Sequence, residues 1–164
     1  MEIAVLVWLI LGLIFMVFGL IPLKGAPWLP SLKRHRQAAF EVLNLKAGQT
    51  IIDLGCGDGR FLKAAAQRGY HAIGYELNPF MYAIAWLITR RYFRLVELHF
   101  GDMWKADISQ ADAIYVFLFD RYMKQLDDKL KAEGKPGLLL ASHTFKIPDK
   151  KPAAEQYGIY LYKY

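Results

Sequence analysis

A glycine-rich turn is the feature of this sequence with the clearest chemical meaning. It reads Asp53-Leu54-Gly55-Cys56-Gly57-Asp58-Gly59 and follows a short apolar run. Glycine permits the positive φ angles of a tight turn and lets a ligand approach the backbone without a Cβ in the way. The spacing is G-x-G-x-G, whereas dinucleotide-binding turns read G-x-G-x-x-G and bind a pyrophosphate. Asp53 and Asp58 would repel a pyrophosphate, so the turn favours a ligand that carries positive charge.

A further acidic residue, Glu76, lies where the next apolar run ends. Glu76 follows Gly74-Tyr75 and precedes Leu77-Asn78-Pro79. An acidic side chain at this place accepts hydrogen bonds from both hydroxyls of a ribose. The alternative is a solvated glutamate at a strand end, but the glycine turn upstream favours the ribose role.

The glycine turn resembles motif I of class I methyltransferases, which bind S-adenosylmethionine. The resemblance implies that Asp102 holds the adenine amino group and that Met103 packs on the adenine ring. The alternatives are an Asx turn at Asp102 and an ordinary strand–helix turn at the glycines. The expected cofactor-binding residues are Asp53, Gly55, Cys56, Gly57, Gly59, Glu76, Leu77, Asp102 and Met103.

Asp120 and Tyr122 are the candidate catalytic residues. They follow the fourth apolar run, where substrate-facing residues of class I methyltransferases usually lie, and either could orient or deprotonate an acceptor. The alternatives are a helix N-cap for Asp120 and a surface position for Tyr122. His143, after the fifth run, is a further candidate base or else a hydrogen-bonded structural histidine.

A lysine acceptor requires a pocket that favours its neutral form. Its ordinary pKa is about 10.4, so reaching the neutral amine at pH 7 requires about 4.6 kcal/mol. An aromatic, partly desolvated pocket lowers that requirement. The candidate substrate-pocket residues are Trp28, Pro30, Tyr75, Asn78 and Phe119, with Tyr122 beside them.

The remaining reactive residue types show no pattern of their own. The four histidines are His35, His71, His99 and His143, which have no paired cysteines or carboxylates, so no metal site is predicted. The single cysteine, Cys56, is interpreted as a small turn residue rather than a nucleophile. Arg90, Arg91 and Arg94 form a basic cluster, interpreted as a solvated helix end, with a nucleic-acid patch as the lesser alternative.

Alternating strands and helices must position these residues. Strands are expected over residues 50–54, 72–75, 95–100, 113–119, 137–142 and 158–162, with room for a weaker strand before the last. Helices are expected over residues 31–45, 59–68, 79–92 and 121–132. This alternation predicts an α/β fold with a doubly wound, mostly parallel sheet of the class I methyltransferase (Rossmann-like) type. Ligands of such folds bind at the carboxyl ends of the strands.

The N-terminal segment has the composition of a transmembrane helix. Ile3 to Ile21 contains no charged residue, and fourteen of its residues are Leu, Ile, Val or Phe. Its length suits a bilayer core of about 30 Å, and these residues favour insertion by about 4 to 8 kcal/mol. The alternatives are a cleaved signal peptide, which would have a basic start and a cleavage site, and a buried core helix.

Positive charges follow this segment, at Lys24, Lys33, Arg34 and Arg36. The positive-inside rule then puts the remaining chain on the cytoplasmic side, or on the matrix side in an organelle. Three domains are expected: a transmembrane anchor over 1–23, a linker and leading helix over 24–48, and a methyltransferase domain over 49–164. Pro22, Pro27 and Pro30 end the anchor and form the linker, and Ser31 is expected to cap the leading helix. Its inner face is expected to be Ala38, Ala39, Val42 and Leu43.

The whole pattern resembles the membrane-anchored protein-lysine methyltransferases, a class I family that includes the ATP synthase c-subunit and adenine nucleotide translocase lysine methyltransferases. The membrane segment, Pro27-Trp28-Leu29-Pro30-Ser31, the glycine turn, Tyr75-Glu76-Leu77-Asn78-Pro79 and Asp102-Met103-Trp104 carry the resemblance. It implies lysine N-methylation of a membrane protein, with S-adenosylmethionine as cofactor and the lipid bilayer as a partner. The chain is short for this family after Ser142.

Other functions stay open at this point. A methyltransferase acting on a lipid, a quinone or another small apolar molecule fits the anchor equally well. A non-catalytic membrane protein that retains the fold is a third interpretation, which the intact glycine turn and Glu76 oppose. The glycine spacing disfavours a nicotinamide-dependent oxidoreductase. Nucleic acid is an unlikely partner, because RNA methylation is supported only by the net charge of +6.

Overall fold

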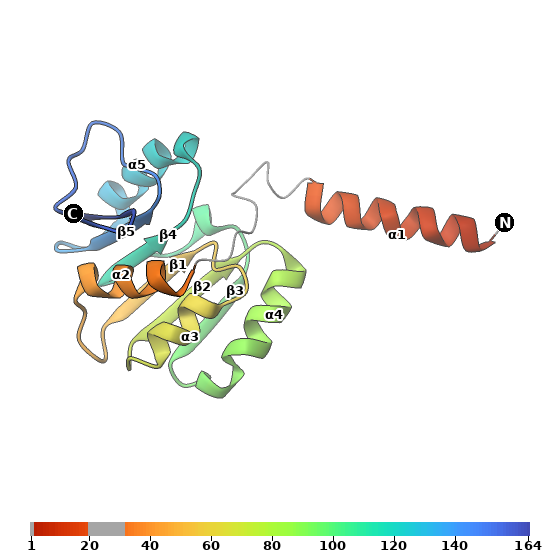
Figure 1. Cartoon of the computed structure of the whole chain (residues 1–164), viewed down its shortest axis with the longest axis horizontal. Coiled ribbons are helices and arrows are strands. Elements are labelled where there is room, and N and C mark those ends of the chain that lie inside the picture. The colour runs from red at the N-terminus through yellow and green to blue at the C-terminus, as the bar shows by residue number, and fades with distance from the viewer. Residues whose placement is uncertain (1, 20–31) are drawn as a thin grey trace.

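A mostly parallel sheet organises the chain after its N-terminal helix (Figure 1). The computed structural model describes residues 2–19 and 32–164, and in that part of the chain the sheet has seven strands. The strands are β1 (Thr50–Leu54), β2 (His71–Glu76), β3 (Val96–Phe100), β4 (Ala113–Val116), β5 (Leu139–His143), β6 (Ala154–Gln156) and β7 (Ile159–Lys163). Their order is β3-β2-β1-β4-β5-β7-β6. The first five strands pair in parallel, whereas β7 runs antiparallel to β5 and β6. The predicted doubly wound, mostly parallel sheet is confirmed.

Helices cover both faces of the sheet (Figure 1). They are α2 (Lys33–Leu43), α3 (Arg60–Ala66), α4 (Pro79–Thr89) and α5 (Met123–Glu133), with 3-10 turns η2 (Arg90–Tyr92), η3 (Met103–Lys105) and η4 (Asp120–Tyr122). Ile51 of β1 packs with α2 and α3 on one face, whereas the neighbouring Ile52 packs with α5 on the other. Successive strand residues point to opposite faces, so two separate cores form. Because both faces are covered, β4 is buried at every position.

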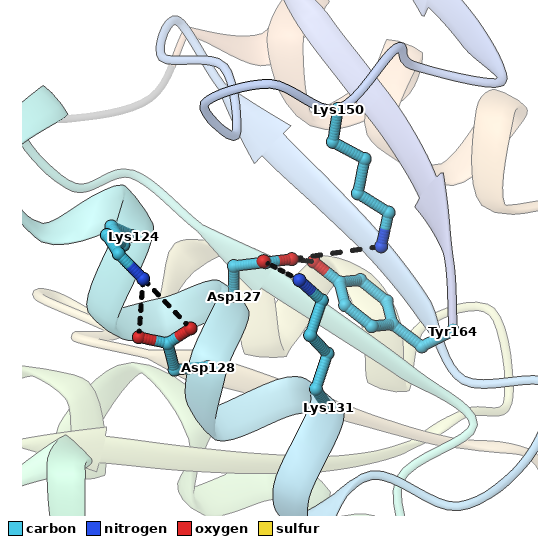
Figure 2. A network of polar contacts seen from close by, with 6 residues as sticks. All are labelled: Lys124, Asp127, Asp128, Lys131, Lys150 and Tyr164. Carbon is cyan, nitrogen blue, oxygen red and sulfur yellow. Dashed lines mark hydrogen bonds and ion pairs between the residues drawn. The ribbon is translucent and has the colours of Figure 1, made fainter.

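A polar network joins α5 to Tyr164, just after β7, and to Lys150, which precedes β6, as Figure 2 shows. The buried Asp127 carboxylate accepts a hydrogen bond from the Tyr164 hydroxyl at 2.7 Å. It also forms ion pairs with Lys131 and, at 3.8 Å, with Lys150. The Lys150 ammonium lies over the Tyr164 ring, 3.2 Å from its centroid. A buried carboxylate is tolerated here because the fold surrounds it with cations and a donor.

The leading helix differs from its predicted form at its start and on its inner face. The structure makes Leu32 the N-cap of α2, without a side-chain cap, so the predicted cap at Ser31 is wrong, and Ser31 itself lies outside the described residues. Phe40 is buried in the core, where it stacks on Phe61 with 4.8 Å between ring centroids. Val42 is only partly buried. Val42 still packs against this core, and Phe40, which the prediction did not include, joins the inner face.

The segment after β4 leaves the sheet earlier than predicted. The strand expected over 113–119 ends at Val116, and the helix expected from 121 begins as the turn η4 before α5. Residues 117–122 therefore form a connection at the carboxyl end of β4. The helix expected to reach residue 92 ends at Thr89 and continues as η2. The weaker strand expected before the last one is β6.

Helix α1 (Glu2–Gly19) precedes this domain. Its apolar side chains are exposed at Ile3, Leu6, Trp8 and Leu9. Over the described residues, no helix meets the length and hydropathy needed to traverse a bilayer. The predicted anchor reaches into residues 20–23, which lie outside the described residues, as do the linker prolines, Lys24 and the pocket candidates Trp28 and Pro30.

Candidate active site

The turn after β1 has a backbone conformation that glycine adopts readily and other residues do not. Gly55, Gly57 and Gly59 have φ angles of 86°, 54° and 75°. Gly59 is also the N-cap of α3, and a Cβ there would lie 2.9 Å from the Cβ of Ala85 in α4. The three glycines of the motif are therefore required by the turn itself, and the last also by helix packing.

Backbone hydrogen bonds hold this turn against the end of β2. The N–H groups of Gly55 and Cys56 both donate to the Tyr75 carbonyl, at 3.0 and 2.9 Å. The Glu76 carboxylate accepts from Gly57 N at 2.8 Å and from Asn78 N at 2.8 Å. Glu76 therefore ties the glycine turn to the start of α4, an organising role that the sequence interpretation did not include. A carboxylate offers about four lone-pair sites, so the ribose role remains open to it.

Three carboxylates are buried together at this edge of the sheet: Asp53, Asp58 and Glu76. Burial, followed by the charges of Glu76 and Asp58, holds the pKa of Asp53 well above its usual value. Burial likewise raises the pKa of Glu76, against the effect of its backbone donors. Arg60 pairs with Asp58 at 2.9 Å from the solvent side. Neighbouring buried carboxylates favour a positively charged ligand, since its charge would relieve their repulsion.

Cys56 lies inside the turn and is itself buried. Burial, and then the charge of Asp53, raises the pKa of its thiol well above the usual value. A Cβ on Gly74 would lie 2.9 Å from the Cys56 sulfur. Because a neutral thiol is a poor nucleophile, this environment supports the interpretation of Cys56 as a packing residue of the turn.

The connection after β3 brings its predicted cofactor residues beside the turn. Met103 is buried, and its sulfur lies 3.8 Å from the position that a Cβ on Gly55 would take. Asp102 is the N-cap of η3 and accepts from Trp104 N at 3.0 Å. The Asx-turn alternative is therefore present at Asp102. Its adenine role stays a prediction, as does the cofactor contact of Leu77, which is partly buried after β2.

Aromatic rings gather over the connections that follow β3, β4 and β5. Trp104 lies 5.9 Å from Tyr122, and Phe119 lies 6.3 Å from Phe145, between ring centroids. Asp120 opens η4 and is exposed, and Phe119 is the N-cap. The N-cap alternative for Asp120 is therefore wrong. The structure places both catalytic candidates in this connection, where an acceptor side chain would meet aromatic groups.

Two pocket candidates have other partners in the structure. Tyr75 stacks on His99, with 4.7 Å between ring centroids. Asn78 is buried and caps α4, with Oδ1 accepting from Phe80 N at 2.9 Å and Met81 N at 3.3 Å. Both side chains serve the local fold of β2 and α4, and their pocket role stays a prediction.

His143 lies at the end of β5, in a group of rings that sequence reasoning did not bring together. Its Nδ1 lies 3.3 Å from the Tyr115 hydroxyl, and its ring centroid lies 4.4 Å from that of His35 and 4.2 Å from that of Phe117. Burial, and then the nearby His35, lowers the pKa of His143 to about 4. So weak a base is poorly matched to deprotonating an amine at neutral pH, which favours the structural alternative. No sequence signal links His35 to His143, because α2 and β5 meet only in the fold.

This chain is similar to lysine methyltransferases over most of its length. A family model described as the ANTKMT methyltransferase domain matches residues 53–154. The ATP synthase c-subunit lysine N-methyltransferase of Rattus norvegicus is 30% identical over 131 residues, which cover 77% of this chain and 59% of that protein. The adenine nucleotide translocase lysine N-methyltransferase of Mus musculus is 34% identical over 141 residues, which cover 84% of this chain and 61% of that protein. The chain thus spans about three fifths of the length of these two relatives.

One solved structure is similar to this chain in fold as well as in sequence. It is an RNA methyltransferase from Salinibacter ruber in complex with S-adenosyl-L-homocysteine, with a TM-score of 0.77 and 27% identity. The match covers 82% of this chain and 93% of that one. Its ligand is the demethylated form of the cofactor that the glycine turn and the buried carboxylates favour.

Proposed function

The chain belongs to the ANTKMT methyltransferase-domain family, and on this premise we propose that it N-methylates a lysine of a membrane protein. Its described domain is a class I methyltransferase domain, and its cofactor is S-adenosylmethionine. The proposal concerns the identity of the acceptor, the membrane setting and the roles of the catalytic residues. The two relatives above support the lysine acceptor, since both are named as lysine N-methyltransferases.

One observation carries the proposal: buried carboxylates lie in and beside a glycine turn whose three glycines have positive φ angles. Asp53, Asp58 and Glu76 create a site for positive charge. S-adenosylmethionine presents a sulfonium and an ammonium, whereas a dinucleotide presents a pyrophosphate. When bound, the cofactor supplies a methyl group that is already activated for transfer.

The protein's own residues have to position the acceptor and prepare its amine. In the transfer, a lysine nitrogen forms a bond to the methyl carbon as the carbon–sulfur bond breaks, and the sulfur retains that electron pair. Trp104, Phe119 and Tyr122 provide aromatic surface that excludes water and thereby lowers the pKa of a lysine. Asp120 or Tyr122 accepts or relays the proton released by the amine. Proximity and alignment account for the remaining rate enhancement.

A membrane anchor at residues 1–23 is part of the proposal. Support comes from the uncharged segment 3–21 and from α1, whose described apolar side chains are exposed. By the positive-inside rule, the basic residues Lys24, Lys33, Arg34 and Arg36 favour the cytoplasmic or matrix side for the domain. Substrates held in the same bilayer would meet the active site by diffusion in two dimensions.

Methylation of RNA is the second candidate function. The name of the Salinibacter ruber protein and the net charge of +6 favour it. An RNA methyltransferase is expected to bind RNA with an affinity that falls steeply as the salt concentration rises. Methylation of a lipid or quinone, which the anchor alone would allow, remains a third outcome of the same assay.

Two experiments test the proposal in sequence. Calorimetric titration of the full chain in detergent should give binding of S-adenosylmethionine and none of NAD. Methyl-labelled cofactor should then be incubated with the chain and with membranes, total RNA or extracted lipid. Label that is protease-sensitive and that mass spectrometry assigns to methylated lysine supports the proposal. Label only in RNA or in the lipid extract overturns it.

A further inference from the structure

Helix α4 carries large apolar side chains on its outer face. Phe80, Ile84, Trp86 and Leu87 are exposed, and Phe93, just beyond η2, is 72% exposed. Phe80, Ile84 and Leu87 follow the i, i+4, i+7 spacing that forms one stripe along a helix. Large apolar side chains are therefore exposed along the length of α4 and just beyond it.

The inner face of the same helix is apolar too. Ala85 is buried against α3, and the buried Thr89 turns its hydroxyl to the Ala85 carbonyl at 2.7 Å. No charged residue occurs between Pro79 and Thr89. A surface helix of a soluble protein normally has a polar outer face, and exposed apolar patches usually mark an interaction site.

Three arginines stand at the end of this apolar row. Arg90, Arg91 and Arg94 are all exposed, and the Arg94 guanidinium lies 5.6 Å from the centroid of the Phe93 ring. Among the described residues, no ion pair joins any of the three to a carboxylate; the nearby Glu97 pairs with His99 at 2.8 Å. The cations therefore remain available for an anionic partner.

We propose that this surface, residues 79–94 and here named the α4 face, docks on the anionic surface of a lipid bilayer. Exposed apolar and aromatic side chains next to arginines are the combination by which helices lie in the membrane interface. Anionic headgroups supply the missing counter-charges. A second copy of the chain offering the same face would supply apolar surface but no anion.

Docking in this way would orient the active site toward the membrane. The start of α4 is capped by Asn78, whose N–H donates to the cofactor residue Glu76. Seating α4 in the headgroup layer therefore holds the carboxyl edge of the sheet near that layer. The inference concerns the bilayer as a partner and does not depend on which molecule accepts the methyl group.

A fluorescent label on the α4 face tests the proposal in the full chain. Leu87→Cys carries an environment-sensitive dye, and Lys124→Cys on α5, across the sheet, is the matched control. The native Cys56 is buried with a raised thiol pKa, so labelling is confined to the introduced cysteine. Vesicles contain phosphatidylcholine alone or an equimolar mixture with phosphatidylglycerol, each with a trace of spin-labelled lipid as quencher.

The expected result is a blue-shifted, quenched dye at position 87 in the anionic vesicles and a water-exposed dye at 124. Replacing Arg90, Arg91 and Arg94 with Gln should weaken docking by about 100-fold, at about fivefold for each arginine, and leave cofactor binding unchanged.

Other outcomes contradict the proposal in distinguishable ways. If the chain floats with the vesicles while the dye at position 87 stays in water, the chain is held by its anchor alone and the docking of the α4 face is overturned. If the chain is dimeric and the dye at position 87 is shielded from water without vesicles, the α4 face binds a second copy of the chain and the proposal is overturned. Equal quenching at 87 and 124, or no association with vesicles, would also overturn it.

Discussion

Two buried carboxylate sites in this molecule have opposite electrostatic surroundings. At the glycine turn, Asp53 lies beside Glu76 and Asp58, and burial together with those charges raises its pKa. On α5, burial also acts to raise the pKa of Asp127, but hydrogen bonds from Lys131 and Tyr164 and the charges of Lys131 and Lys150 lower it overall (Figure 2). At Asp127 the fold supplies cations beside the carboxylate, whereas the charges that act on Asp53 are the carboxylates of Glu76 and Asp58, and Arg60 pairs with Asp58 from the solvent side.

The contrast separates stability from function. A carboxylate matched by its own protein contributes to folding, whereas a carboxylate held among other carboxylates opposes folding until a cation binds. Active sites commonly retain such unfavourable groups because binding or catalysis needs them. Four predictions test the contrast.

The largest effect is expected from Glu76→Gln. The change removes one of the two carboxylate oxygens that hold the Gly57 and Asn78 N–H groups, and it would weaken the charged hydrogen bonds that Glu76 is proposed to make to a ribose. Each such bond contributes about 1.5–3 kcal/mol, so we expect affinity for S-adenosylmethionine to fall by about 100-fold or more. Calorimetry measures the loss, and unchanged affinity would remove Glu76 from the cofactor site.

Asp53→Asn should weaken cofactor binding by about 10- to 100-fold, the value of one lost charged interaction. It should not destabilise the unliganded domain, because it removes the burial of a charge, and then the repulsion by Glu76 and Asp58, that raise the Asp53 pKa. Parallel measurements of Kd and of Tm without ligand check both parts. A clear fall in Tm would break the contrast, since Asp53 would then behave like Asp127.

Asp127→Asn should lower stability by about 2 kcal/mol, or Tm by about 4–8 °C for a domain of this size. Cofactor affinity should not change. Asp128→Asn is the matched control, because the Lys124–Asp128 pair is exposed on the same helix (Figure 2). An exposed pair contributes about 1 kcal/mol at most, so equal losses from the two variants would show that the network around Asp127 adds nothing.

The smallest effect is expected from pH. An ordinary aspartate has a pKa of about 3.9. The Asp53 pKa is raised, so its ionisation destabilises the unliganded fold as pH rises above that value and strengthens cofactor binding over the same range. The Asp127 pKa is lowered, so its stabilisation is complete above about 3.9 and is lost as pH falls through the lowered value. Affinity measured from pH 4 upward, with Asp53→Asn alongside, should depend less steeply on pH in the variant. Tm measured below as well as above about pH 3.9 tests the loss of the Asp127 contribution. If affinity depends on pH with the same slope in both proteins, a titrating group other than Asp53 causes that dependence.

Much of the fold could be predicted because local signals agreed with one another. The apolar runs of β1 and β4, the glycine turn and the alternation of strands with helices required no long-range information. Errors occurred where tertiary contacts outweighed local preference. Phe40 is buried on the inner face of α2, where it stacks on Phe61, and β4 ends at Val116 although the apolar residues Phe117 to Phe119 follow.

The sequence by itself determined the kind of turn, the sheet that presents it and the preference for a cationic ligand, because backbone conformation and periodicity are local properties. Only the tertiary structure decided the direction in which the pKa of Asp53, Glu76 and Asp127 is shifted, the contact between the rings of His35 and His143, and the exposure of the α4 face. Burial and neighbouring charges depend on segments distant in sequence, such as α2 beside β5 or Tyr164 beside Asp127. The sequence of one segment therefore does not determine the burial or the neighbouring charges of its residues.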